Sequence, residues 1–287
     1  MVCRIIQFYR HSYEKVNVII YVAGYPKSGT TWITRLLGDV LDCRTGGCLP
    51  EQDSVEIATE GFDRSRTDVV VRKGHFTLLD DKSSIPVMKL HQMCWKALDP
   101  AEHKVVFVIR DPRDIAVSGA FHWRITASNF LLNMISGEGG ISRIGTWHGY
   151  IRSWLDRANK FNAITVKYED MLKGAKELKA LVKKLEFNVS AKDIYAAYER
   201  QQFENRVKDI ERNGHNYPLG KEFNLSFMRS GVSGDWRNYL TPQDAYLCEE
   251  YFGNLLRYLN YESDPFWHKK HQLSDLKWRE LQWRHLL

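Results

Sequence analysis

The chain has 287 residues, of which 44% are hydrophobic and 26% are charged, and it carries a formal net charge of +6. This composition is typical of a soluble globular protein, and the modest positive charge suits an anionic ligand without requiring nucleic acid. No apolar run approaches the roughly 20 residues that a membrane span needs, and the segment after Met1 lacks a signal-peptide core. The five cysteines form no metal-spaced set, so we expect reduced cysteines and a cytoplasmic protein.

Apolar runs alternate with helical patterns along most of the chain. The pattern predicts buried strands at 17–23, 85–90, 104–109 and 163–168. It predicts helices at 30–42, 111–123, 146–160, 175–186, 190–201 and 243–258, the first of them capped by Thr30. Such alternation indicates an α/β fold, a three-layer sandwich with a central parallel sheet.

The chain shows no repeat, low-complexity tract or linker, so we expect a single domain over residues 1–287. Residues 42–68 sustain no period, and we interpret them as a long loop that forms an acceptor lid. The C-terminal tail, 261–287, carries tryptophans among basic residues. We interpret the tail as a terminal helix packed on the domain, and a protein or membrane-surface contact is the alternative.

The segment from Gly24 to Trp32 predicts a phosphate site. It lies between an apolar strand and a helix start, where backbone N–H groups and the helix dipole favour an anion. Gly24 and Gly29 have the separation of a Walker loop, but Thr30 stands where that loop has its lysine, and the lysine is Lys27. The hydroxyls of Thr30 and Thr31 open the helix. Trp32 offers a flat face for a base, and core packing is the alternative for this residue.

Two further segments follow strand-like runs. Arg110 ends the strand at 104–109, at the edge where an α/β sheet binds its ligand, and Ser118 lies about two turns along the next helix. The alternative for Arg110 is an ion pair with Asp111 or Asp114, at the cap of that helix.

Lys89 and His91 lie on one face at the end of the strand at 85–90. A histidine beside a phosphate loop is a natural general base, and a structural histidine is the alternative. The last segment holds Arg229, Ser230 and Gly231 within 227–238, and its glycines and basic residues suit a loop that folds over an anion.

Together these segments resemble the cytosolic-type sulfotransferases that use 3′-phosphoadenosine 5′-phosphosulfate (PAPS), which have a P-loop-like fold. The matching segments are Tyr25–Trp32 (5′-phosphosulfate loop), Arg110 with Ser118 (3′-phosphate motif), Lys89–His91 (catalytic base), Tyr168–Met171, Phe203 (adenine sandwich) and Arg229–Trp236 (C-terminal signature). They run in the family's order from about residue 18 to 241.

The sequence departs from the family at three places. Ser230 stands where the C-terminal signature carries a lysine, and Gln201 and Gln202 replace small hydroxylated residues before Phe203. The dimerisation motif that should fall near 237–246 is altered, so the oligomeric state is left open.

The resemblance implies in-line transfer of a sulfuryl group from PAPS to a hydroxyl, amino or guanidino group, with PAP as product and no metal. His91 would be the base, Lys27 would meet the leaving phosphate and Lys89 the sulfuryl oxygens. The implied nucleotide-binding residues are Lys27, Ser28, Gly29, Thr30, Thr31, Trp32, Arg110, Ser118, Tyr168, Phe203, Arg229, Ser230 and Gly231.

The sequence predicts only the chemical class of the acceptor. The lid carries more acidic than basic residues, among them Asp53, Glu56 and Glu60, which suits a polar or cationic small molecule, such as a natural product of secondary metabolism. The alternative is a solvated loop. Two other functions stay open: a P-loop kinase or nucleotidase, and a nucleotide-binding module without catalysis.

Overall fold

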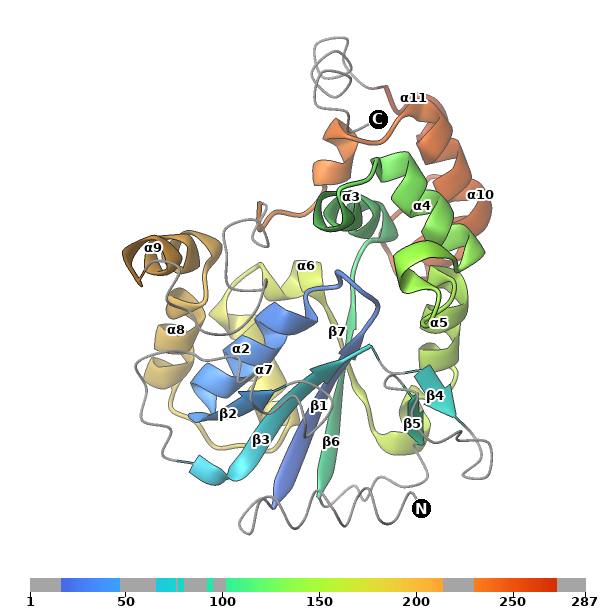
Figure 1. Cartoon of the computed structure of the whole chain (residues 1–287). Helices are drawn as coiled ribbons and strands as arrows, with labels where there is room; N and C mark the ends of the chain where they lie inside the picture. The colour runs from blue at the N-terminus through green and yellow to red at the C-terminus, as the bar shows by residue number, and fades with distance from the viewer. Residues whose placement is uncertain are drawn as a thin grey trace. The chain divides into compact units, whose positions relative to one another are not determined.

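The computed structural model describes residues 17–46, 66–75, 77–79, 92–94, 102–213 and 230–272. Its strands are β1 (Val18–Gly24), β2 (Cys43–Gly46), β3 (Arg66–Gly74), β4 (Thr77–Leu79), β5 (Gln92–Cys94), β6 (His103–Ile109) and β7 (Ile164–Lys167). Its α-helices are α2 (Thr30–Val40), α3 (Pro112–Trp123), α4 (Ala127–Ser136), α5 (Trp147–Leu155), α6 (Tyr168–Met171), α7 (Ala175–Lys184), α8 (Ala191–Arg200), α9 (Phe203–Asn213), α10 (Pro242–Tyr258) and α11 (Trp267–Lys270) (Figure 1). The 3₁₀ helices are η4 (Gly139–Ile141), η5 (Ala158–Phe161) and η8 (Asp235–Asn238).

The backbone groups into two compact units, which are described separately. Unit 1 comprises the described residues within 1–24, 29–109 and 153–228, and unit 2 those within 25–28, 110–152 and 229–287. The single domain over 1–287 stays a prediction. Within the described part of the chain, no helix has the length and apolar character needed to cross a membrane.

Unit 1 is built on a five-stranded sheet with the order β2-β3-β1-β6-β7, and every neighbouring pair is parallel. Ala23 of β1 lies opposite Gly74 of β3 on one side and Phe107 of β6 on the other. The carboxyl ends of these three strands therefore meet at one edge, where ligands of open α/β sheets bind. β4 and β5 form a separate parallel pair.

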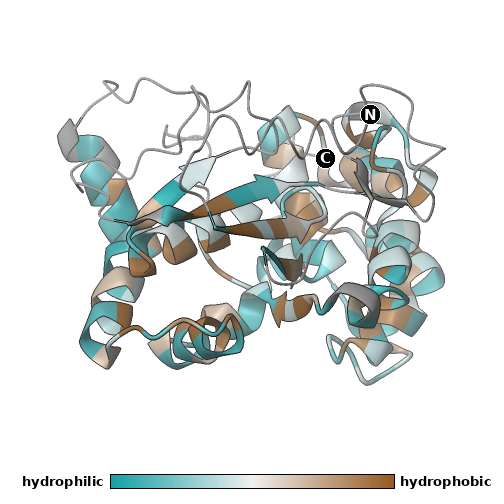
Figure 2. Cartoon of the chain, turned by 90° about the horizontal axis from the view of Figure 1, so that it is seen from below, coloured by the Kyte–Doolittle hydropathy of each residue, from teal (hydrophilic) through white to brown (hydrophobic). Residues whose placement is uncertain are grey.

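The core of unit 1 lies between the sheet and the helices α2, α7 and α8. Alternate residues of the strands, such as Val22 of β1 and Val108 of β6, are buried with Leu36 of α2 and Leu178 of α7 in one cluster. On the other side of β6, Phe107 stacks on Trp154 with 4.6 Å between ring centroids. Figure 2 shows the hydrophobic colour gathered along the strands of the sheet. The burial of β1 and β6 explains their near-continuous apolar sequences.

In unit 2 the helices begin with strong capping signals. The Asp111 side chain accepts a hydrogen bond from the backbone N–H of Arg113, and Pro112 occupies the first turn of α3. At the start of α10, Thr241 and Asp244 form a capping box. α4 packs on α3 at Gly119, where a Cβ would collide with the Phe130 ring.

The α/β class with its central parallel sheet is confirmed, and several details differ from prediction. The cap of α2 is Gly29, and Thr30 is the first helical residue. The predicted buried strand at 163–168 is the edge strand β7, which is only partly buried because it pairs on one side. β2 lies inside the predicted loop at 42–68, and β3 and α4 were not predicted. The predicted strand at 85–90 and lid residues 47–65 lie outside the described residues.

Candidate functional site

The loop between β1 and α2 turns sharply at two residues. Lys27 and Gly29 have positive φ angles of 68° and 91°. Glycine adopts this left-handed conformation readily, whereas Lys27 does so at a cost in strain, which is typical of functional loops. Tyr25 anchors the start of the turn in unit 2, because it is fully buried and its hydroxyl donates to the carbonyl of Gly145 at 2.9 Å. Its burial raises the pKa of the Tyr25 phenol, so the phenol stays neutral.

The loop leaves polar groups that an anion would satisfy. Gly29, the cap of α2, offers no side-chain acceptor to the first-turn N–H groups of Thr30, Thr31 and Trp32. In unit 2, Oγ of Ser28 is fully buried and has no hydrogen-bond partner among the described residues. Leaving a buried hydroxyl unsatisfied is costly, and a phosphate oxygen would be a suitable partner. The loop residues therefore fit a phosphate group.

Tyr168, the first residue of α6, lies directly against the loop glycine in unit 1. A Cβ at Gly29 would collide with the Tyr168 ring. Tyr168 also makes an edge contact with Trp32, with 5.5 Å between ring centroids and 72° between ring planes. The structure therefore brings together Gly29, Trp32 and Tyr168, three residues that the sequence predicts to bind the nucleotide.

We expect Gly29→Ala to lower thermal stability and to weaken PAP binding. The alanine would have to adopt φ near +91°, which costs about 1–2 kcal/mol, and would also displace the Tyr168 ring. Gly145→Ala is the matched control, because Gly145 has φ +87° but open space around its Cβ position. Thermal unfolding and PAP titration check this prediction. Equal effects of the two substitutions would show that contact with Tyr168 is unimportant.

The Trp32 indole is held in place by a residue far away in sequence. Nε1 of Trp32 donates to the carbonyl of Gln201 at 2.8 Å. The Gln201 amide in turn donates to Asp39 at 2.9 Å, and Arg200 pairs with the same carboxylate at 2.8 Å. Trp32 remains partly exposed. The backbone of Gln201 thus supports Trp32, and the Gln201 side chain ties that backbone to Asp39, which sequence reasoning missed.

Two unpredicted polar side chains lie at the end of β3, Lys73 within the strand and His75 directly after it. Nζ of Lys73 donates to Oγ1 of Thr31 at 3.0 Å. Nδ1 of His75 lies 2.8 Å from the carbonyl oxygen of Gly24. The signal that could have found them is a second Lys-x-His pattern, Lys73-Gly74-His75.

In unit 2, Arg110 follows the end of β6 and contacts the loop. Its Nη1 donates to the carbonyl of Lys27 at 3.1 Å, and the side chain is buried. Ser118 lies on α3, as predicted, and is partly buried. The structure thus brings Arg110 to Lys27, which supports the interpretation of Arg110 as part of an anion site.

Asp114 holds the C-terminal signature against α3. Its carboxylate accepts hydrogen bonds from the backbone N–H of Gly234 at 2.7 Å and of Trp236 at 3.0 Å. Burial and the nearby Asp111 raise the pKa of Asp114, although Arg110 and the two backbone donors oppose the shift. The segment that begins with Ser230 and Gly231 is thereby fixed within the same unit as Arg110.

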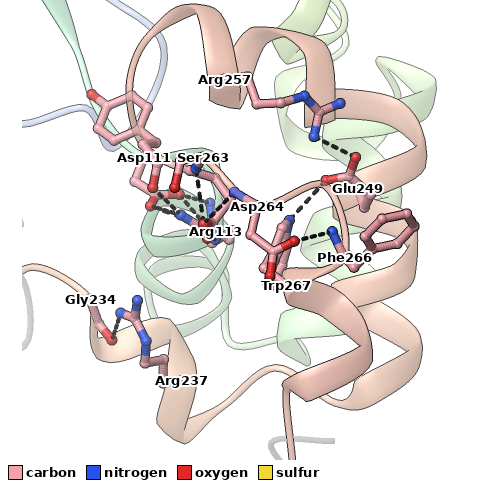
Figure 3. Close-up of polar contacts among 12 residues, drawn as sticks. Asp111, Arg113, Gly234, Arg237, Glu249, Arg257, Ser263, Asp264, Phe266 and Trp267 are labelled. Atoms are coloured by element: carbon pink, nitrogen blue, oxygen red, sulfur yellow. Dashed lines mark hydrogen bonds and ion pairs between the residues drawn. The ribbon is translucent and has the colours of Figure 1, made fainter.

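Arg113 is the centre of a buried cluster that ties α3 to the C-terminal segment (Figure 3). It pairs with Asp111 at 2.8 Å and with Glu262 at 3.2 Å. Its guanidinium lies 4.2 Å from the Trp236 ring centroid and 4.6 Å from that of Trp267. Burial opposes the charge, but Asp111 and Glu262 raise the pKa of Arg113 overall. The described start of the predicted C-terminal tail, which holds Glu262 and Trp267, therefore packs on α3 within unit 2.

The predicted site residues fall into three sets. Unit 1 holds Gly29, Thr30, Thr31, Trp32, Tyr168 and Phe203, the last at the start of α9. Unit 2 holds Lys27, Ser28, Arg110, Ser118, Ser230 and Gly231. The predicted residues Lys89, His91 and Arg229 lie outside the described residues.

Comparison with known proteins gives consistent matches. The sulfotransferase domain family matches residues 19–260. Sulfotransferase 2A6 of Rattus norvegicus is 32% identical over 251 residues, which cover 79% of this chain and 81% of that protein. Amine sulfotransferase of rabbit (Oryctolagus cuniculus) is 26% identical over 242 residues, 79% of this chain and 76% of that protein.

Solved structures share the fold. The mouse sulfotransferase SULT7A1, crystallised with PAP, superposes with a TM-score of 0.60 at 24% identity and covers 91% of both chains. Retinol dehydratase in complex with androsterone and PAP superposes with a TM-score of 0.57 at 17% identity, over 85% of this chain and 83% of that one. Since the domain match extends over residues 19–260, this chain belongs to the sulfotransferase family, which confirms the family and the enzyme class predicted from its sequence.

Proposed function

We propose that this enzyme transfers a sulfuryl group from PAPS to a hydroxyl, amino or guanidino group of a small molecule and releases PAP. The observation that carries the proposal is the loop at the start of α2, which combines an uncapped helix N-terminus, a buried and unsatisfied Ser28 hydroxyl, and a lysine at its tip. Two structural relatives are complexes with PAP, which supports the same donor here.

The nucleotide-binding roles follow the family resemblance. Ser28, Thr30 and Thr31 would hold the 5′-phosphate together with the loop N–H groups, and Trp32 would stack on adenine with Phe203. Arg110, Ser118, Arg229, Ser230 and Gly231 would hold the 3′-phosphate. Tyr168 would approach the nucleotide, and its contact with Gly29 supports that role. Fixed cations and N–H groups would then stabilise the developing charge without a metal ion.

The resemblance assigns the proton transfer to a histidine, for which the sequence offers His91 with Lys89 beside it. Lys27 would neutralise the phosphate oxygen from which the sulfuryl group departs. The bond from Arg110 to the carbonyl of Lys27 supports this role, because it fixes the backbone that carries the lysine.

The acceptor is proposed to be a polar or cationic small molecule held by a lid within residues 47–65. The acidic residues of that segment support this class, as does the name of the rabbit relative, an amine sulfotransferase. A cytoplasmic location and a role in secondary metabolism are parts of the same proposal.

Incubation with ³⁵S-labelled PAPS and pools of small metabolites tests the function. We expect the label to move to a small molecule, identified by mass spectrometry, at the same rate with EDTA present. Label that remains on the donor, together with Mg²⁺-dependent ATP turnover, would indicate a kinase or nucleotidase instead. PAP binding without transfer to any pool would indicate a binding module.

A further inference from the structure

Trp32 and Asp39 lie about two turns apart on α2, in unit 1. Because an α-helix has about 3.6 residues per turn, these two positions lie on the same face of the helix. The side chain of Asp39 is only 1% exposed, whereas Trp32 is partly exposed. The helix therefore presents a buried carboxylate and a partly open indole to the same neighbour, which is the end of α8.

Gln201, which directly follows α8, bridges these two side chains. Its carbonyl oxygen accepts a hydrogen bond from Nε1 of Trp32 at 2.8 Å, and its side-chain Nε2 donates to Oδ2 of Asp39 at 2.9 Å. Its backbone N–H donates to the carbonyl oxygens of Ala197 and Tyr198, both at 3.2 Å, so the last turn of α8 also holds it. The indole, the glutamine and the carboxylate thus form a closed ring of contacts in which each member restricts the others.

Arg200 completes the set of donors around the Asp39 carboxylate. Its Nη2 lies 2.8 Å from Oδ1 of Asp39, and its Nε lies 3.3 Å from Oδ1 and 3.2 Å from Oδ2. Together with the amide of Gln201, these donors use both carboxylate oxygens. An ionised carboxylate accepts at both oxygens, whereas an asparagine side chain offers one acceptor and one donor group. The arrangement therefore requires a carboxylate at position 39.

The contacts around Asp39 fix the ring on which adenine would stack. Tyr168 and Tyr198 also meet the Trp32 ring edge-on, with 5.5 Å and 6.4 Å between ring centroids. Burying a carboxylate beside an arginine adds little stability by itself, because the cost of removing the charge from water offsets much of the attraction. The pair instead supplies a fixed orientation, since hydrogen bonds to a supporting residue lock a side chain that contacts a ligand. A ring held in this way loses less freedom when it binds a base.

We infer that Asp39 is a positioning residue for the adenine of the donor, and that it acts through Gln201 on Trp32. The inference rests on the proposed use of PAPS and on the proposed stacking of its adenine on Trp32. Gln201 stands where the family has a small hydroxylated residue, so the resemblance alone does not supply this role. Because Asp39 acts on the stacking ring, its replacement should weaken the binding of the base and spare the binding of the phosphates.

Asp39→Asn tests the inference through calorimetric titration with two ligands, PAP and an abasic analogue of PAP in which hydrogen replaces adenine. The asparagine must turn a donor group toward either Arg200 or Gln201, so the ring of contacts opens. We expect PAP affinity to fall about tenfold, within the usual contribution of one stacked base, and affinity for the abasic analogue to stay close to that of the wild type. The KM for PAPS should rise more than kcat falls, because the base lies away from the reacting bond. Glu199→Gln is the matched control, since Glu199 is exposed on α8, and it should leave both affinities unchanged.

Gln201→Met decides the matter if circular dichroism shows that Asp39→Asn does not fold. This variant keeps the ion pair between Asp39 and Arg200 and removes only the amide link, so it should show the same selective loss of PAP affinity. In a folded double variant, Asp39→Asn should add little to the loss caused by Gln201→Met. Equal losses for PAP and the abasic analogue, wild-type PAP affinity in Gln201→Met, or additive losses in the double variant would each overturn the inference. A wild-type enzyme that does not bind PAP would instead refute the proposed function.

Discussion

We expect Lys27→Met to reduce the rate of sulfuryl transfer by about 10²–10³-fold, the usual loss when one preorganised electrostatic group is removed from an active site. Lys27 lies at the tip of the loop, and its proposed role is to neutralise the leaving phosphate oxygen. Arg110 bonds to the carbonyl of Lys27, so the loop backbone keeps a contact that does not depend on the lysine side chain. Methionine has a similar unbranched stem, and its left-handed strain at this position should match that of lysine.

Steady-state kinetics with PAPS and calorimetric titration with PAP check this expectation together. The loss should fall mainly on kcat, because the charge that Lys27 meets develops as the sulfuryl group departs. Lys179→Met is the control, since Lys179 is exposed on α7 in unit 1, and it should leave both quantities unchanged. A wild-type kcat in Lys27→Met would show that the Lys27 side chain takes no part in the reaction.

Arg113→Met should lower the free energy of unfolding by about 3–5 kcal/mol, the cost of breaking a buried ion pair by removing one partner. The substitution removes the guanidinium that pairs with Asp111, a carboxylate with only 5% exposure. It also removes the cation that lies close to both the Trp236 ring and the Trp267 ring. Because Asp111 also caps α3, the loss should extend to the helix that follows Arg110.

Urea denaturation followed by tryptophan fluorescence measures this loss, and Arg237→Met provides a close control. The guanidinium of Arg237 lies 4.3 Å from the same Trp236 ring, but the residue is exposed. Its replacement should therefore change stability by less than about 1 kcal/mol, the usual size of an exposed cation–π contact. Equal losses in the two variants would contradict the central role of the buried ion pair.

Local signals in the sequence predict much of this fold. The apolar runs of β1 and β6 reflect strands buried on both faces, and Asp111-Pro112 marks the start of α3, because these effects act within a few residues. The prediction that Thr30 caps α2 is wrong. The left-handed backbone of Gly29 makes the glycine the cap, and Thr30 is the first helical residue.

The residues that support the site depend on contacts between distant parts of the chain. The carbonyl of Gln201 meets Trp32 across 169 residues, and Asp114 meets the backbone of Gly234 across 120. Lys73 reaches Thr31 only because β3 inserts beside β1 in the sheet order. A pattern along the sequence carries no information about such pairings, so these supporting contacts could not be predicted from it.

The central claim is that the loop at 24–32 serves sulfuryl transfer instead of nucleotide triphosphate hydrolysis. A single-turnover measurement with ³⁵S-labelled PAPS in EDTA, run beside Mg²⁺-ATP under the same conditions, tests it most directly. We expect the label to move to an acceptor with PAP as the other product, and ATP to stay intact. Hydrolysis of ATP with Mg²⁺, without transfer from PAPS, would contradict the claim.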